Sequence, residues 1–358
     1  MPPTTKAFAA RMPFLDWTRG LAAVLMLQGH VFHSFTRGDL REGSHYVLSQ
    51  FVGGMPPAIF LFLTGITLSF LMYSRERRED PPWERIKASL RRAGYLLMMA
   101  YLFRIQLALF GWGQSQWTDI FKVDILNCMG LSIAVMSLMA AFGAEDRARL
   151  SIMAGLAIAG LAPLVSEIDM SGWNPIVRAY IQADVRFFSF FPWASYLAFG
   201  LGAGTVLRLL PIERLHHSMQ WFCLSGLSLV VCAHYFSNLP FSLYPNVNFW
   251  LNSPGLIFIK LGVTMVFVSF SYLWMDLYAG KSWSWVRQLG TTSMLVYWVH
   301  IELVYGRWLG GWKENLSVPQ TALMAASLIG LMVIVSLGQT KWKAFSAEFA
   351  KKAENAPG

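Results

Sequence analysis

The sequence predicts an all-α fold, a polytopic membrane bundle of about ten transmembrane helices, and three observations support this class. Hydrophobic residues make up 55% of the 358 residues and charged residues only 14%, whereas charged residues are about a quarter of a soluble domain. Apolar runs of bilayer-spanning length recur from one end of the chain to the other. Continuous apolar runs are typical of helices, which satisfy all their backbone hydrogen bonds internally. We therefore expect a multi-pass integral membrane protein.

Ten apolar runs have the length that a bilayer requires. They lie at 14–35, 51–73, 89–110, 121–142, 150–168, 187–209, 219–236, 254–278, 289–308 and 318–337. We assign all ten to a single transmembrane domain, residues 1–338, followed by a solvated tail, residues 339–358. Between the fifth and sixth spans, the segment NPIVRAYIQ is expected to form an interfacial helix.

Positive charge concentrates in the segment between the second and third spans. Its basic residues are Arg75, Arg77, Arg78, Arg85, Lys87, Arg91 and Arg92. Cytoplasmic segments carry an excess of Lys and Arg, so this segment and, with ten spans, both termini are expected in the cytoplasm. The same bias accounts for the net charge of +9, and we expect no nucleic-acid partner.

The first span, FLDWTRGLAAVLMLQGHVFHSF, carries Asp16, Arg19, His30 and His33. Ionisable groups inside a span are costly and by default mark a functional site. Arg19 and His30 are eleven residues apart, which is about three helical turns, so both lie on one face and about 16 Å apart along the axis. A guanidinium near one membrane surface thus shares a stripe with an imidazole in the far half.

Depth in the membrane predicts which residues of other spans lie level with His30. His30 lies about 22 Å above the cytoplasmic end of its helix, and His300 of the ninth span about 16 Å above its own. The fourth span enters from the outer side, so Asp124 and Asn127 fall in its first turns. The second span opens with two prolines, which remove backbone donors and distort a helix. Two imidazoles, a carboxylate and a broken helix are therefore expected to converge in the outer half of the membrane.

The other polar residues of the spans predict no second site. Four ionisable residues in or near spans are expected to pair inside the bundle, with no partner assigned: Arg104, Lys260, Asp276 and Glu302. The three cysteines lie in apolar segments without metal-ligand spacing: Cys128, Cys223 and Cys232. Neither a disulfide framework nor a metal site is indicated.

Several stretches together resemble the transmembrane acyltransferase superfamily. The first span contains the pattern R-x10-H as Arg19 and His30, and Arg75 and Arg78 form an R-x-x-R like that of the sugar O-acetyltransferase branch. Further similar stretches are PPAIFLFLTGITLSF, VDILNCMGLS, FPWASYLAFGLGAG and LGTTSMLVYWVHIELV. The resemblance covers roughly residues 11 to 337. Members of the superfamily include bacterial acyltransferases that acetylate surface sugars and heparan-alpha-glucosaminide N-acetyltransferase.

The resemblance implies an enzyme that takes an acyl group, expected to be acetyl, from cytoplasmic acyl-CoA. It delivers that group to a hydroxyl or amine of an extracytoplasmic sugar or glycan. His30 matches the essential histidine of the superfamily and Arg19 its partner arginine. The expected location is the bacterial cytoplasmic (inner) membrane, in contact with membrane lipid, and a homodimer is one assembly that we consider.

Acyl transfer from a thioester needs a base, a polarised carbonyl and two substrates held in contact. Histidine suits the first role because it titrates near neutral pH, so His30 is expected to act as general base or, as a nucleophile, to carry the acyl group. The remaining roles are expected as follows: Asp124 orients an imidazole, His300 and Asn127 bind the acceptor or the thioester oxygen, His33 contacts substrate, and Arg19, Arg75 and Arg78 bind the phosphates of acetyl-CoA.

Each of these residues also has a purely structural interpretation. Arg19 can extend its charge to the cytoplasmic surface, and the arginines after the second span can act only in setting topology. Asp124 can cap the fourth helix, His33 can face outer water, and His30 can bond a neighbouring carbonyl.

Two other classes of function remain open at this point. A transporter of an anionic or sugar solute would line its path with the same buried charges. A structural subunit of an envelope-polymer system would not need His30 at all. Replacing His30 by alanine distinguishes the enzyme, which loses activity, from that subunit, which does not.

Overall fold

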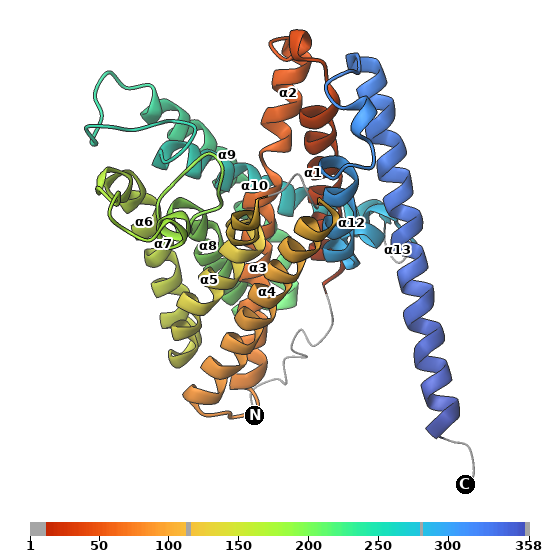
Figure 1. Ribbon diagram of the computed structural model, residues 1–358. Coiled ribbons are helices and arrows are strands. Elements are labelled where there is room, and N and C mark those ends of the chain that lie inside the picture. Colours follow the sequence, from red (N-terminus) through yellow and green to blue (C-terminus); the bar gives the residue numbers. More distant parts are fainter. Residues whose placement is uncertain (1–11, 112–115, 280–281, 355–358) are drawn as a thin grey trace. The chain divides into compact units, whose positions relative to one another are not determined.

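The computed structural model describes residues 12–111, 116–279 and 282–354, and these form helices joined by short connections (Figure 1). Apart from one isolated bridge between Thr36 and Leu316, no strand occurs in these ranges. Seven helical segments in them are long and apolar enough to cross a membrane. The all-α polytopic fold predicted from the sequence is therefore confirmed.

Helices occupy each of the ten expected spans. In chain order they are α1 (Pro13–Phe35), α3 (Pro56–Glu76), α4 (Pro82–Phe110), α5 (Ile125–Met136) with η3 (Ser137–Ala141), α6 (Ala144–Glu167), α8 (Phe190–Leu209), α9 (Leu215–Ser237), α10 (Pro254–Trp274) with η5 (Met275–Ala279), α11 (Trp285–Thr291) with α12 (Ser293–Tyr305), and α13 (Val318–Glu354). The expected interfacial helix is α7 (Pro175–Ile181), and α2 (Ser44–Gly53) precedes α3. The short 3-10 segments η1 (Gly38–Leu40), η2 (Trp117–Phe121), η4 (Ile212–Arg214) and η6 (Gly310–Trp312) lie in connections.

Three of the ten differ from long apolar spans. The polar residues of α1 lower its mean hydropathy, so it is not among the seven segments that are both long and apolar enough to cross a membrane. The fourth span is a short α-helix continued by a 3-10 turn, and the ninth is divided at Thr292 into α11 and α12. The broken helix that the prolines predict is also present, because the chain stops being helical after Gly53 and resumes at Pro56.

The arginine-rich segment differs from the expected loop. Helix α3 extends to Glu76 and α4 begins at Pro82, so only residues 77–81 form the connection. Four of the basic residues expected in a loop thus lie on the first turns of α4. Lys and Arg are good helix formers, and their long side chains reach polar surroundings from within a helix.

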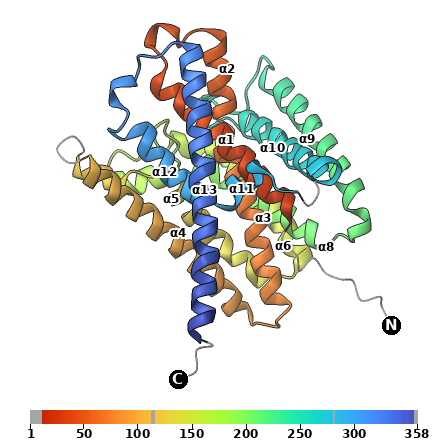
Figure 2. The same ribbon diagram turned by 90° about the vertical axis from the view of Figure 1, so that its right-hand side faces the viewer.

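The chain divides into two compact units, and each is described here by itself. The middle unit is Pro57–Tyr272, and the terminal unit combines Met12–Pro56 with Leu273–Gly358. In the middle unit, α6 packs along α8, and α5 contacts both α4 and α8. In the terminal unit, α1 packs against α2, α11, α12 and α13 (Figure 2).

Glycines permit a close contact between α1 and α11 in the terminal unit. A Cβ atom at Gly20 of α1 would overlap the carbonyl oxygen of Val286, and one at Gly290 of α11 would overlap the carbonyl oxygen of Asp16. Small residues let helix backbones approach closely in membrane proteins. This crossing holds the N-terminal half of α1 against α11.

The described part of the C-terminal segment is helical. Helix α13 runs without interruption across the expected boundary at residue 338 and reaches Glu354, the last residue described. Residues 341–348 are exposed, in keeping with the solvated character predicted for them.

Candidate functional site

The centre of the terminal unit contains a pair of histidines from helices that are distant in sequence. The Nδ1 atom of His30 in α1 lies 3.0 Å from the Nε2 atom of His300 in α12. The two rings are nearly parallel, with an interplanar angle of 16° and centroids 5.2 Å apart. His300 is fully buried and His30 is partly buried. The convergence of these imidazoles was predicted from their depths.

The hydrogen bonds define which nitrogen of each ring carries a proton. The Nδ1 atom of His300 lies 2.7 Å from the carbonyl oxygen of Val296. A carbonyl can only accept, so Nδ1 of His300 carries the hydrogen and its Nε2, in the neutral ring, holds a lone pair. That lone pair accepts from His30, which places the proton of the neutral His30 ring on Nδ1. The remaining nitrogen of His30, Nε2, therefore presents a lone pair.

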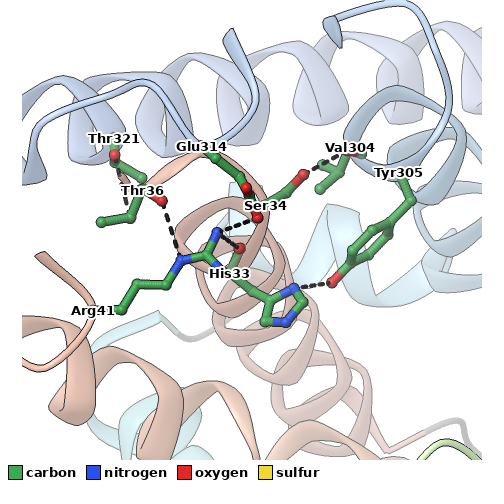
Figure 3. Close-up of polar contacts among 8 residues, drawn as sticks. All are labelled: His33, Ser34, Thr36, Arg41, Val304, Tyr305, Glu314 and Thr321. Carbon is green, nitrogen blue, oxygen red and sulfur yellow. Dashed lines mark hydrogen bonds and ion pairs between the residues drawn. The ribbon is translucent and has the colours of Figure 1, made fainter. Parts of the chain in front are cut away.

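A tyrosine ring packs against each histidine of the pair. The ring of Tyr305 meets that of His30 edge-on, with centroids 5.3 Å apart, and Tyr297 meets His300 in the same manner at 5.9 Å. The hydroxyl of Tyr305 is also 3.5 Å from Nδ1 of the exposed His33 (Figure 3). His33 is thus connected to the histidine pair through Tyr305.

A set of polar contacts fastens the C-terminal end of α1 to α12 and to the connection after it. Ser34 donates its hydroxyl to the carbonyl of Val304 at 2.9 Å. Arg41 donates to Glu314 at 2.9 Å and to the carbonyl of His33 at 3.1 Å, as Figure 3 shows. We call these contacts the clasp. It fixes the relative positions of the helix ends that carry His30, His33 and Tyr305.

At the other end of α1, Arg19 pairs with a carboxylate of its own helix. Its Nη1 atom lies 3.1 Å from Oδ1 of Asp16, whose side chain is 6% exposed. Between this pair and His30, the residues Ala22, Ala23 and Met26 are buried. The arginine and histidine predicted to share one helix therefore stand at opposite ends of a packed apolar stretch.

Asp124 and Asn127 belong to the middle unit and form a capping box at the start of α5. Asp124 accepts from the backbone N–H groups of Leu126 and Asn127, and the Asn127 side chain accepts from the Asp124 N–H. The second oxygen of Asp124 lies 3.4 Å from Nε of Arg104. These contacts fit the capping interpretation, and an orienting role of Asp124 toward an imidazole stays a prediction.

Two tyrosines extend this group of polar residues. Asn127 donates its amide to the hydroxyl of Tyr180 at 2.8 Å, and that hydroxyl lies 2.9 Å from the hydroxyl of Tyr101. The contacts connect α4, α5 and α7 of the middle unit. The sequence identified Arg104 as a residue in need of a partner, and the structure supplies Asp124.

The two arginines of the R-x-x-R motif differ in their surroundings. Arg75 lies in the last turn of α3 and forms an ion pair with Asp80 at 3.2 Å, while Arg78 is exposed in the connection to α4. The backbone N–H of Arg78 donates to the carbonyl of Arg75, so a tight turn brings the two residues together. Two guanidinium groups thus lie at one end of the middle unit.

The sequence did not identify Tyr305 as a candidate. A tyrosine near the end of a span is typical of the interfacial belt, which conceals any other role. Its position five residues after His300 was the sequence feature that could have identified it as a candidate.

In the described parts of the chain, no cluster of three or more His, Cys, Asp or Glu residues is arranged to hold a metal ion.

Comparison with known proteins identifies the family of this chain. The model of a family described as heparan-alpha-glucosaminide N-acetyltransferase, catalytic, matches residues 11–229. This match covers more than half of the chain and includes Arg19, His30, Asp124 and Asn127, whereas His300 lies beyond it. A comparison with curated proteins found no match. The chain belongs to the family of the heparan-alpha-glucosaminide N-acetyltransferase catalytic domain.

Proposed function

We propose that this membrane acyltransferase moves an acetyl group from cytoplasmic acetyl-CoA to a hydroxyl or amine of a sugar or glycan across the membrane. Family membership supports acyl transfer between an acyl donor and a sugar acceptor. The more specific proposal rests on the His30–His300 pair. Its hydrogen bonds leave Nε2 of His30 unprotonated, so this nitrogen can accept a proton or attack a carbonyl carbon.

In direct transfer, Nε2 of His30 removes the proton from the acceptor O–H or N–H. The acceptor atom forms a bond to the acetyl carbonyl carbon, the C–S bond of the thioester breaks, and the released thiolate takes a proton from the imidazolium. In the covalent alternative, the same nitrogen attacks the carbonyl carbon first, the C–S bond breaks and the thiolate leaves. The acceptor atom then bonds to the acetyl carbon, the bond from that carbon to the imidazole nitrogen breaks, and the proton of the acceptor ends on the thiolate. Both routes use the lone pair of His30 Nε2, and the resemblance to the acyltransferase superfamily leaves both open.

His300 acts in this proposal as a positioning residue. Its Nδ1–H is held by the Val296 carbonyl, so its Nε2 can only accept from His30. When His30 gains a proton, its Nδ1–H becomes the donor of a charge-assisted hydrogen bond, which is stronger than a neutral one. His300 thereby fixes the reactive tautomer of His30 and stabilises the charged form.

The phosphates of acetyl-CoA require cations. Arg75 and Arg78 lie in a tight turn that the sequence places on the cytoplasmic side, and Arg19 lies near the end of α1 expected on the same side. One guanidinium can donate two hydrogen bonds to the oxygens of a phosphate. We assign phosphate contacts to Arg75 and Arg78 of the middle unit and, independently of them, to Arg19 of the terminal unit.

The test is acetyl-CoA turnover by the purified full chain with a panel of sugar acceptors. We expect His30→Ala to lower kcat by at least about 100-fold, because positioned proton transfer contributes about that much or more. His234→Ala is the matched control, since His234 is an exposed histidine in the last turn of α9. Release of about one equivalent of CoA per protein without acceptor would favour the covalent route.

The positioning role of His300 has its own readout. We expect His300→Gln to keep more activity than His300→Ala, because the amide oxygen of glutamine can accept from Nδ1 of His30. The loss should fall on kcat, while KM for acetyl-CoA changes little. Equal losses in the two variants would contradict the tautomer assignment. Absence of turnover with several acyl donors in the wild type would contradict the proposed function itself and favour a transporter.

A further inference from the structure

Tyr305 stands between the buried histidine pair and the surface. It ends α12, and its ring meets that of His30 edge-on. The residue is nevertheless 41% exposed. The ring of Tyr305 thus contacts His30, the proposed base, while the residue remains accessible from the surface.

The hydroxyl of Tyr305 is directed at a second polar group. It lies 3.5 Å from Nδ1 of His33, an exposed residue one turn of α1 beyond His30 (Figure 3). A tyrosine of the interfacial belt needs no contact with an imidazole, whereas this ring contacts two. Its orientation is therefore set by the site.

The clasp keeps these groups in place before any ligand arrives. Ser34 binds the carbonyl of Val304, next to Tyr305, and Arg41 binds both the carbonyl of His33 and the carboxylate of Glu314. The backbone N–H of Leu316 also donates to the carbonyl of Phe35. Such preorganisation lowers the free-energy cost of ordering side chains on binding.

The groups around Tyr305 indicate what kind of ligand fits. The ammonium of Lys313 donates to the carbonyls of Tyr305 and Gly306 at 2.9 and 2.8 Å, and Arg41 is paired with Glu314. An aromatic ring beside a hydroxyl and an imidazole fits a ligand that has an apolar face and hydroxyls.

We propose that Tyr305 and His33 form the acceptor subsite, in which the ring packs on the apolar face of a sugar ring while the hydroxyl and the imidazole bind its hydroxyl groups. This inference rests on the proposed function and extends it to the residues that hold the acceptor. It places the acceptor hydroxyl or amine next to His30, whose ring Tyr305 contacts.

The experiment compares Tyr305→Leu, Tyr305→Phe and His33→Asn with wild type, using glucosamine and glucose as acceptors and acetyl-CoA as donor. We expect Tyr305→Leu to raise KM for the sugar at least about tenfold. Tyr305→Phe, which loses only a hydrogen bond, and His33→Asn should raise it about two- to tenfold. KM for acetyl-CoA should stay within about twofold. Trp312→Leu, another exposed aromatic in the same region of the chain, is the control.

The outcomes separate the subsite from the proposed function. A sugar KM within about twofold of wild type in Tyr305→Leu, or a parallel rise in both KM values, would overturn the subsite while leaving the acyltransferase proposal intact. Equilibrium dialysis with labelled glucosamine and glucose runs in parallel. Saturable binding that Tyr305→Leu abolishes supports the subsite even without detectable transfer, and binding that is absent in the wild type or unchanged in Tyr305→Leu contradicts it.

Discussion

Arg147 is the largest of the fully buried side chains and the clearest buried charge in the middle unit. The side chain of Arg147 is 1% exposed, and its Nη2 atom lies 2.9 Å from a carboxylate oxygen of Glu76, whose side chain is 32% exposed. A second contact, to the carbonyl of Phe142, measures 3.4 Å. A buried charge without a partner is strongly unfavourable, so the end of α3 is held to the start of α6 by this pair.

Glu76→Ala is expected to destabilise the protein by about 1–3 kcal/mol, because the cost of leaving Arg147 unpaired is of that size or larger. The measurement is the thermal melting temperature of the detergent-solubilised protein. Glu145→Ala serves as control, since its pair with Arg149 is 3.8 Å long and both side chains are more than 70% exposed. Exposed pairs contribute about 0–1 kcal/mol. Equal melting temperatures for the two variants would show that Arg147 finds another partner.

The candidate site shows which properties of single residues could be predicted from the sequence. The spacing of Arg19 and His30 and the depth of His300 were sufficient to propose the histidine pair. Which nitrogen of each ring carries a proton depends on the Val296 carbonyl, and the partner of Arg104 depends on the packing of α4 against α5. Neither can be inferred from the pattern of one helix.

At the scale of the helices, the glycine contact between α1 and α11 positions the segment that leads to His30. Gly20 and Gly290 each face a backbone carbonyl of the other helix, with no room for a methyl group. Farther along α1, Gly29 approaches Gly53 of α2, where an added Cβ would lie 2.6 Å from the Gly53 Cα. Helix α1 is therefore held on two sides by contacts that only glycine permits.

Gly290→Ala is expected to force α11 away from α1, with a loss of about 1–3 kcal/mol or more, as found for overpacked cores. The readouts are melting temperature and the monodisperse fraction in size-exclusion chromatography. Gly330→Ala provides the control, because a Cβ atom at that position of α13 would meet no atom within 4 Å. A Gly290→Ala protein as stable as this control would mean that the crossing readily loosens.

The boundaries of the helices were predicted less well than their existence. The divided ninth span and the helical continuation of α13 both differ from the expected runs. Hydropathy measures how apolar a window is, but a helix ends where its backbone groups find other partners. At Thr292, for example, the side chain binds Ser336 of α13 and the carbonyl of Gln288.

At the scale of the whole molecule, the distribution of Lys and Arg predicts that both termini are cytoplasmic. A fluorescent protein that folds only in the cytoplasm should fluoresce when fused to the C-terminus. Alkaline phosphatase, which is active only outside, should be active when fused after residue 43, in the connection between α1 and α2, and inactive when fused after residue 79. Activity at residue 79 would reverse the orientation and place the arginines of the R-x-x-R motif away from acetyl-CoA.

The sequence by itself determined the class of fold, the membrane helices and the acyltransferase family, together with the Arg19–His30 stripe. These features are local, because hydropathy and helical periodicity are properties of consecutive residues. Only the tertiary structure decided that His300 contacts His30, that Tyr305 lies beside His30, and that Asp124 caps α5 and pairs with Arg104. His30 and His300 are 270 residues apart, and contacts over such separations depend on how helices pack, which no single stretch of sequence specifies.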